Sequence, residues 1–161
     1  MKEQHISKWA EQLNKLSLRD FPKLFASAAI YDLQGIYRAS FVGPGWLRAT
    51  AGPAIAIGGL GGWWGKRFKE DGRATNLVRR GGKLESRLPM RLIATTSVLD
   101  GRPTLALIYS AENPFPWPYV VDELRALDPV TFLGMMHINA GPLRKIAFPF
   151  LLEYQEQVDG L

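Results

Sequence analysis

The chain has 161 residues and a mass of 18.0 kDa, which fits one domain, and its 47% hydrophobic residues are enough to build a core. It has no cysteine and only two histidines, His5 and His137, which excludes disulfides, thiolate metal sites, cysteine nucleophiles and a His-rich zinc centre. The 16 glycines and 11 prolines argue against a plain helical bundle, and the net charge is +5. We therefore expect no metal and no cofactor.

The first part of the chain has the pattern of amphipathic helices. Ile6, Trp9, Leu13 and Leu16 recur at spacings of three and four, which places them on one helix face. A short second helix is expected to start near Pro22, because proline suits the first helical turn. We expect residues 1–29 to be a helical segment that packs on or caps the rest of a single domain, 1–161.

The chain shows no pattern of membrane insertion or export. Its N-terminus is mixed in charge and lacks the apolar run of a signal peptide. The stretch of lowest polarity, 51–64, is rich in glycine and shorter than the roughly 20 apolar residues of a membrane span. We expect a cytoplasmic protein with no transmembrane segment.

After Leu33 the pattern changes to short strand-like segments separated by turn residues such as Asp100-Gly101. Such a series predicts a mainly β fold, an antiparallel barrel of about eight strands over 30–155, with a sandwich as the alternative. The strand candidates are residues 33–42, 61–68, 74–78, 83–99, 102–110, 118–127, 130–138 and 145–155.

The connection Gly43–Gly62, which follows the first strand and is called here the 43–62 connection, departs from this pattern. It is too long for a hairpin turn and too apolar for an exposed loop, and long connections are often functional. Two interpretations stay open. The connection either forms helical turns that lie over an opening as a lid, or it plugs one barrel end as core.

Residues 66–91 have nine basic and three acidic residues, a local charge of +6 against +5 for the whole chain. This segment is either the solvated outer face of consecutive strands or a surface for nucleic acid or anionic lipid. No aromatic residue lies between Lys69 and Arg91, whereas nucleic-acid modules interleave aromatic with basic residues. We therefore disfavour nucleic acid as a partner.

Two motifs carry a resemblance to a known family. GWWGKRF at 62–68 resembles the Gly-(Trp/Tyr)-Gly-Lys-x-Phe signature of the bacterial GXWXG-motif proteins, which have an adjoining domain of unknown function. LQGIYRA at 33–39 is similar to their opening Leu-x-Gly-x-Trp-x-Gly strand, although Tyr37 replaces the tryptophan and Ala39 the last glycine.

Later segments extend the resemblance in the same order. Ala106 and Tyr109 stand where the family closes a strand with a small residue and a tyrosine. VVDELR at 120–125, LGMM at 133–136 and FPFLLE at 148–153 are similar to further family segments. The resemblance implies a small barrel of the calycin or lipocalin-like kind and a family with no assigned activity.

The strand predicted at 118–127 has charges on both faces, because alternate residues of a strand share a face. Asp122 lies on one face, and Glu123 and Arg125 lie on the other. Either Asp122 is an interior carboxylate with a partner elsewhere, or Glu123 and Arg125 are an interior pair in which the arginine holds a ligand carboxylate. A third interpretation is an edge strand with Glu123 and Arg125 in solvent and Asp122 capping a turn.

The strand predicted at 61–68 places Trp63 and Trp64 on opposite faces. Lys66 shares the face of Trp64 by strict alternation, so an interior Trp64 brings Lys66 inward as well. A buried lysine there is able to neutralise Asp122 or Glu123.

Apolar stripes on the other strands are typical either of core or of a ligand box. Met135 and His137 share one face of the strand at 130–138, and Phe148 lies in an apolar stripe of the last strand. Tyr109 is a hydrogen-bond donor beside apolar neighbours. An eight-stranded barrel has room for its side chains or for one small ligand.

We expect the barrel interior to bind a small hydrophobic molecule that carries a polar or acidic group. The expected ligand-binding residues are Trp64, Lys66, Tyr109, Arg125, Met135 and Phe148. The first alternative is a cofactor-independent isomerase or cyclase in the same cavity, with Tyr109, Asp122 and His137 as proton-transfer groups. The second is an interaction module that uses the basic surface. The sequence leaves open whether there is catalysis, and also the oligomeric state.

Overall fold

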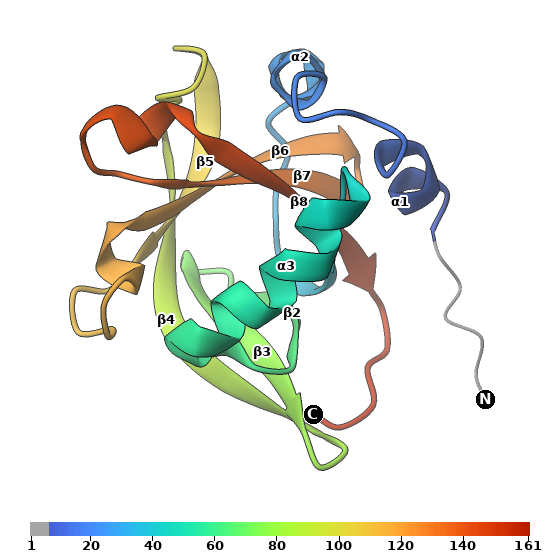
Figure 1. Cartoon of the computed structure of the whole chain (residues 1–161). Coiled ribbons are helices and arrows are strands. Elements are labelled where there is room, and N and C mark those ends of the chain that lie inside the picture. The colour runs from blue at the N-terminus through green and yellow to red at the C-terminus, as the bar shows by residue number, and fades with distance from the viewer. Residues whose placement is uncertain (1–6) are drawn as a thin grey trace.

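Eight strands form a closed barrel in the computed structural model, which describes residues 7–161 (Figure 1). Each strand pairs antiparallel with the next, and β1 closes the ring on β8 from Ile36↔Gln155 to Phe41↔Phe150. The predicted mainly β antiparallel barrel is confirmed, and the sandwich alternative is wrong. The strands are β1 (Gly35–Phe41), β2 (Trp63–Phe68), β3 (Arg73–Arg80), β4 (Lys83–Thr96), β5 (Pro103–Tyr109), β6 (Val120–Asp128), β7 (Thr131–Ile138) and β8 (Ala147–Gln155).

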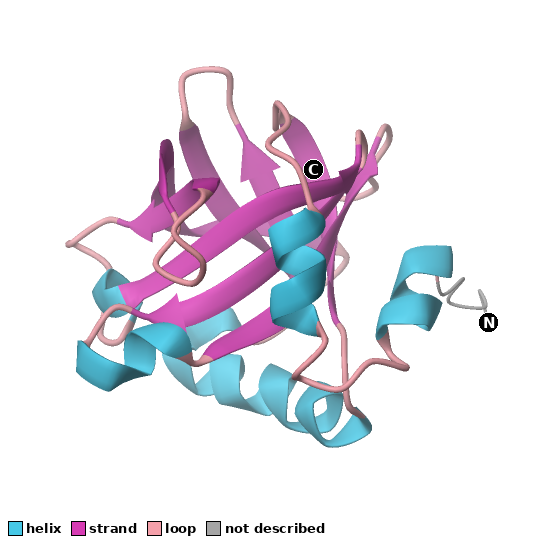
Figure 2. Ribbon diagram, turned by 90° about the horizontal axis from the view of Figure 1, so that it is seen from above, coloured by secondary structure: helices cyan, strands magenta, loops and turns pink. Residues whose placement is uncertain are grey.

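Helical segments gather at one end and one side of the barrel (Figure 2). Ser7 caps the first helix, because its hydroxyl accepts a hydrogen bond from the Ala10 N–H at 3.0 Å. Pro22 lies in the first turn of the second, as expected, whereas His5 and Ile6 lie outside the described residues. The segments are α1 (Lys8–Leu13), α2 (Phe21–Ser27), α3 (Gly45–Ile55), the π-helical turn η1 (Ala56–Leu60) and the 3₁₀ turns η2 (Trp117–Tyr119) and η3 (Gly141–Lys145).

The helices α1 and α2 pack against the outside of the barrel, beside β7 and β8. Phe21 and Phe25 of α2 are fully buried there against outward-facing residues such as Leu133 and Leu151. The outer face of these strands is therefore apolar too, and β6 and β7 are buried along almost their whole length.

Inside the barrel, aromatic side chains fill the half at which β1 begins. Tyr37 contacts Phe68 and Phe132 edge to face, with ring centroids 5.5 and 5.6 Å apart. The other half, at which β1 ends, lies under α3 and is less completely filled. This is the half that contains the site described below.

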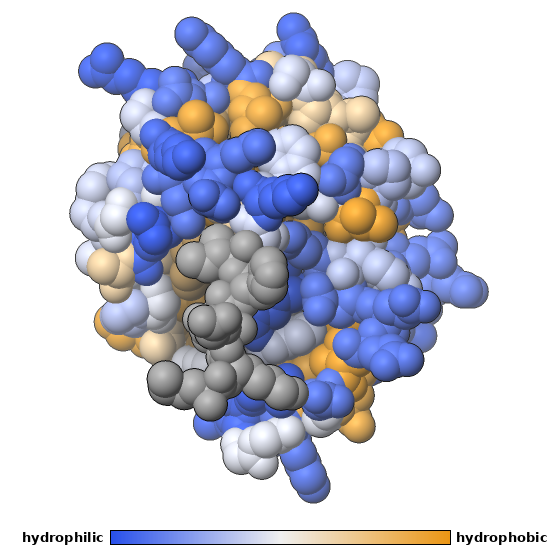
Figure 3. Space-filling view, turned by 90° about the vertical axis from the view of Figure 1, so that its right-hand side faces the viewer, coloured by the Kyte–Doolittle hydropathy of each residue, from blue (hydrophilic) through white to orange (hydrophobic). Residues whose placement is uncertain are grey.

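The outer surface on the side of the N-terminal helix is mostly hydrophilic, with separate apolar spots between charged side chains (Figure 3). Of the helices within residues 7–161, none combines the length and the apolar character needed to cross a membrane.

Candidate functional site

An apolar cavity of about 280 Å³ occupies the half of the barrel under α3. Its walls come from the strands on one side and from α3 and η1 on the other, so the 43–62 connection covers this space rather than filling it. The apolar side chains that line it include Phe41, Trp63, Trp117, Met136, Phe148 and Phe150.

The 43–62 connection is held at both of its ends. Near its start, the Gly43 N–H donates to Asn14 Oδ1 at 3.3 Å. Near its end, the Trp117 Nε1 donates to the carbonyl of Gly58 at 2.6 Å. A Cβ at Gly58 would lie 2.9 Å from the indole ring of Trp117, so glycine is needed for this close packing.

Four polar side chains meet at the inner end of the cavity, and we call them the polar cluster: Lys66, Asn76, Tyr109 and Asp122. The Lys66 Nζ lies 3.0 Å from Asp122 Oδ2, 2.8 Å from Asn76 Oδ1 and 3.4 Å from the Tyr109 hydroxyl. All four residues are at least 96% buried. Because β2 and β6 stand opposite each other in the ring of eight strands, the Lys66–Asp122 pair crosses the barrel.

Asn76 joins the members of the polar cluster, and sequence reasoning missed it. It lies directly opposite Lys66 on β3. Its Oδ1 also accepts from the Trp63 Nε1 at 3.1 Å, and its Nδ2 donates to the Tyr109 hydroxyl at 3.2 Å. The available signal was an asparagine, a residue depleted in strands, in the middle of the apolar segment 74–78.

Burial shifts the acid–base equilibria of the polar cluster. Desolvation lowers the pKa of Lys66, and the charge of Asp122 opposes this shift. Desolvation and the same carboxylate raise the pKa of Tyr109 well above its usual value, so its hydroxyl keeps its proton at neutral pH. The Lys66 ammonium also lies 5.4 Å from the centroid of the Trp63 ring.

The expectation that Trp64 points inward is wrong, and Trp63 takes its place. The register of β2 and β3 shifts between Trp63, which pairs with Val78, and Gly65, which pairs with Leu77. This bulge breaks strict alternation, so Trp63 and Lys66 both face the cavity. A Cβ at Gly65 would collide with the carbonyl oxygen of Tyr37, so only glycine fits beside the bulge.

Trp64 lies outside the barrel between two arginines. The guanidinium carbons of Arg38 and Arg79 lie 5.0 and 5.8 Å from the centroid of its ring. Trp64 lines an outer hollow beside α1 rather than the cavity.

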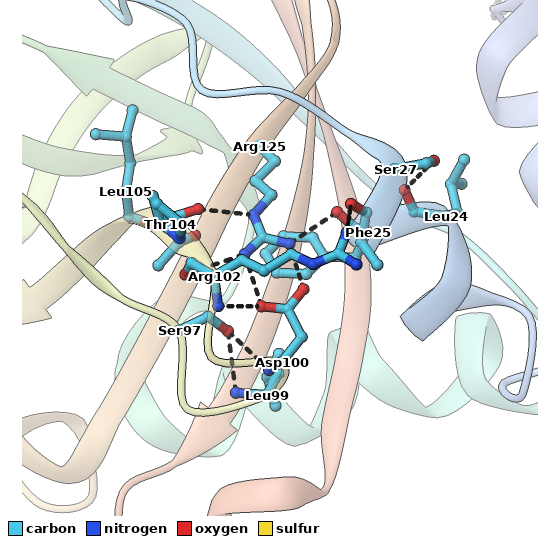
Figure 4. A network of polar contacts seen from close by, with 12 residues as sticks. Leu24, Phe25, Ser27, Ser97, Leu99, Asp100, Arg102, Thr104, Leu105 and Arg125 are labelled. Atoms are coloured by element: carbon cyan, nitrogen blue, oxygen red, sulfur yellow. Dashed lines mark hydrogen bonds and ion pairs between the residues drawn. The ribbon is translucent and has the colours of Figure 1, made fainter.

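Arg125 is buried on the outer face of β6 and does not reach the cavity, which corrects the expected ligand contact (Figure 4). Its Nη1 and Nη2 bind the two carboxylate oxygens of Asp100 at 2.5 and 2.8 Å. Nη1 also donates to the carbonyl of Phe25 at 2.9 Å. The guanidinium carbon of Arg125 lies 4.1 Å from the centroid of the Phe25 ring. Arg125 therefore ties α2 to the turn after β4. The hydrogen bonds from Arg125 lower the pKa of Asp100 to about 2.

Met135 and His137 also lie on the outer face, against the expectation that they line the cavity or transfer protons in it. Met135 belongs to the outer core under α2. The Nε2 of His137 lies 3.0 Å from Glu123 Oε2, and both side chains are buried. Strand alternation explains the result, because Met136 and Asp122 occupy the inner face. The edge-strand interpretation of this segment is wrong as well, since β6 pairs with both β5 and β7.

A second apolar hollow of about 440 Å³ adjoins the cavity on the side of η1 and η3. The two share the side chains of Ile55, Trp117, Met136 and Phe148. Its rim includes Phe115, which is 81% exposed.

Most of the basic residues within 66–91 lie in solvent, but Lys66 is buried in the polar cluster. Two of the exposed arginines are paired with neighbouring carboxylates: Arg73 with Asp71 at 2.6 Å and Arg87 with Glu85 at 2.8 Å. Within residues 7–161, no three His, Cys, Asp or Glu side chains gather in a way that could hold a metal ion.

Comparison with solved structures finds the crystal structure of a protein from Thermomonospora curvata, with a TM-score of 0.68 and 19% sequence identity. The match covers 91% of this chain and 93% of that chain. At this identity the likeness shows the fold alone. No family model matches the chain, and no curated protein matches it. The resemblance to the GXWXG-motif proteins therefore stays a prediction.

Proposed function

We propose that the chain binds a small hydrophobic molecule with one polar group in the cavity under α3. The observation that carries this proposal is the union of an apolar cavity of about 280 Å³ with a buried polar cluster at its inner end. Binding sites for small molecules are typically apolar hollows with a few well-placed polar groups.

The energetics of the Lys66–Asp122 pair support the same proposal. Burying two charges costs several kcal/mol per ion, and apolar residues of similar size are often no less stabilising. The barrel nevertheless keeps this pair, 3.0 Å apart, beside a space that its side chains leave open. A role in ligand binding accounts for both features.

The test is calorimetric titration of the protein with octan-1-ol and sodium octanoate, with the tryptophan fluorescence followed in parallel. We expect saturable binding of at least one compound. In the Ala51→Phe variant, a ring placed on the cavity side of α3 should weaken that binding at least tenfold. Gly52→Ala is the matched control on the same helix, because a Cβ there meets nothing within 4 Å. Absence of binding, or equal binding by both variants, contradicts the proposal.

A second function, a cofactor-independent isomerase or cyclase in the same cavity, is favoured by one distance. The carboxyl group of Asp122 lies 3.0 Å from a second titratable group, the amine of Lys66, and both line the cavity. Tyr109 lines the same cavity and is the third candidate proton-transfer group, whereas His137 does not line it and pairs with Glu123 instead.

This alternative predicts that a small ketone such as 3-cyclohexenone exchanges α-protons for deuterium in the presence of the protein and D₂O. The rate, measured by NMR, should fall to the buffer rate in Asp122→Asn. Exchange at the buffer rate with the unaltered protein counts against catalysis and leaves binding as the function.

A further inference from the structure

We infer that the molecule bound in the cavity carries a hydroxyl group, as an alcohol or phenol, which donates to Asp122 Oδ1 and accepts from Tyr109. This inference rests on the proposed binding function and names the chemical class of its ligand. It follows from counting the donors and acceptors that the polar cluster already uses.

Lys66 has no donor left for a ligand. An ammonium group has three hydrogens. The Lys66 Nζ has three oxygen partners at hydrogen-bond distance, on Asp122, Asn76 and Tyr109. An anionic ligand group would therefore have to displace one of these partners.

Asn76 is likewise fully used. Its carbonyl oxygen accepts from Lys66 and from the Trp63 indole. Its amide group donates to the Tyr109 hydroxyl and lies 4.0 Å from the Met90 sulfur. Asn76 is thus a positioning residue, and it has no free hydrogen-bond donor or acceptor for a ligand.

One acceptor and one donor remain. Asp122 Oδ1 is buried and has no hydrogen-bond partner within residues 7–161, although its residue lines the cavity. The Tyr109 oxygen accepts two hydrogen bonds, and its own proton goes to none of the described residues. A buried polar atom without a partner is costly. A hydroxyl group supplies both missing partners at once, because it donates one hydrogen bond and accepts others.

Charge selects against the other polar groups of similar size. Lys66 and Asp122 neutralise each other in a site with almost no solvent. A ligand carboxylate would put a second negative charge beside Asp122, and a ligand ammonium would put a second positive charge beside Lys66. Of the two ligand groups expected from the sequence, polar or acidic, these charges favour a neutral polar group.

Four octyl compounds test this assignment by calorimetry: octan-1-ol, methyl octyl ether, sodium octanoate and octylamine. The ether accepts a hydrogen bond but cannot donate one, so it leaves Asp122 Oδ1 unpaired. We expect octan-1-ol to bind about tenfold more tightly than the ether, because leaving a buried acceptor unpaired weakens binding by about that factor. The carboxylate and the amine should bind at least as weakly as the ether.

Two variants separate the two hydrogen bonds. Asp122→Asn should reduce the ratio of alcohol to ether affinity towards one. Tyr109→Phe should weaken both compounds together and keep the ratio, because both accept from Tyr109. Trp64→Phe, outside the barrel, is the control and should keep the affinities and the ratio. Thermal melting shows that each variant is folded, and the ligand series on the unaltered chain does not depend on them.

The outcomes are distinguishable. If none of the four compounds binds, the proposed function itself fails. If octanoate or octylamine binds as tightly as octan-1-ol, or if the ether does, the cavity binds ligands but the hydroxyl assignment is overturned.

Discussion

β6 buries charged side chains on both of its faces, Glu123 and Arg125 on the outer face and Asp122 on the inner face. Arg125 and Asp122 are bound in different ways. On the outer face, the Arg125 guanidinium is bound by Asp100 and by the carbonyls of Phe25 and Pro103. On the inner face, Asp122 Oδ1 has no partner within residues 7–161 and borders a cavity. A buried charge whose bonds are all met by its own chain holds elements together. A buried charge with bonding capacity left over, next to open space, is a site for something else.

The largest effect is expected when the inner pair is broken. Asp122→Leu leaves the Lys66 ammonium buried without its counter-ion, and we expect the free energy of unfolding to fall by about 3–5 kcal/mol. The double variant Lys66→Met/Asp122→Leu removes both charges, so it should recover most of that loss. Urea denaturation measures both changes.

The double variant is also the sharper test of the comparison. Its barrel should be stable and yet no longer prefer octan-1-ol over methyl octyl ether. A double variant that is as unstable as the single one would show that the inner pair supports the fold in the same way as the outer one.

Breaking the Arg125–Asp100 pair on the outer face should lower stability without changing ligand binding. Asp100→Asn removes the charge that the Arg125 guanidinium binds, and we expect a loss of about 2 kcal/mol in the free energy of unfolding. Arg125 keeps its carbonyl partners, which limits the loss. Ligand affinity should not change, because neither residue lines the cavity. A loss of binding without a loss of stability would reverse the roles of the two faces.

Acid should remove the stabilisation that the Arg125–Asp100 pair gives to the fold. Arg125 holds the pKa of Asp100 at about 2 in the folded chain, below the value of about 3.9 in an unfolded chain. The pair therefore stabilises the fold above about pH 4, and this contribution is lost as the pH falls through about 2. Melting temperatures of the unaltered chain and of Asp100→Asn should converge between pH 4 and 2. A gap that persists at pH 2 would show that the charge of Asp100 is not what stabilises the fold.

The barrel could be predicted from the sequence because turn residues separate most of its short strands. Asp100-Gly101 is one such turn, and each predicted strand is found close to its expected place. The 43–62 connection stood out by its length and its apolar residues, and it is the segment that covers the cavity. These signals are local in the sequence, so they can be recognised without knowledge of the tertiary contacts.

The site could be predicted only in part, because tertiary contacts decide which side chains of a strand point into the barrel. Lys66, Tyr109, Asp122 and Phe148 line the cavity as expected. Arg125 belongs to a face that looked solvent-exposed or internal by alternation alone. Arg125 is buried on the outside because α2 covers it. The alternation of residues along a strand does not show which helix packs on its outer face.

The smallest effect is expected at Trp64, and it tests whether a bulge or strict alternation sets the inner face of β2. Because Trp64 lies between Arg38 and Arg79 outside the barrel, Trp64→Phe should cost less than about 1 kcal/mol in the free energy of unfolding. It should leave the affinity for octan-1-ol unchanged, whereas Trp63→Phe should lower it, since the Trp63 indole binds Asn76 at the cavity. If calorimetry shows the reverse, β2 alternates without the bulge at Gly65. The inner face of β2 would then be the one that strict alternation predicts.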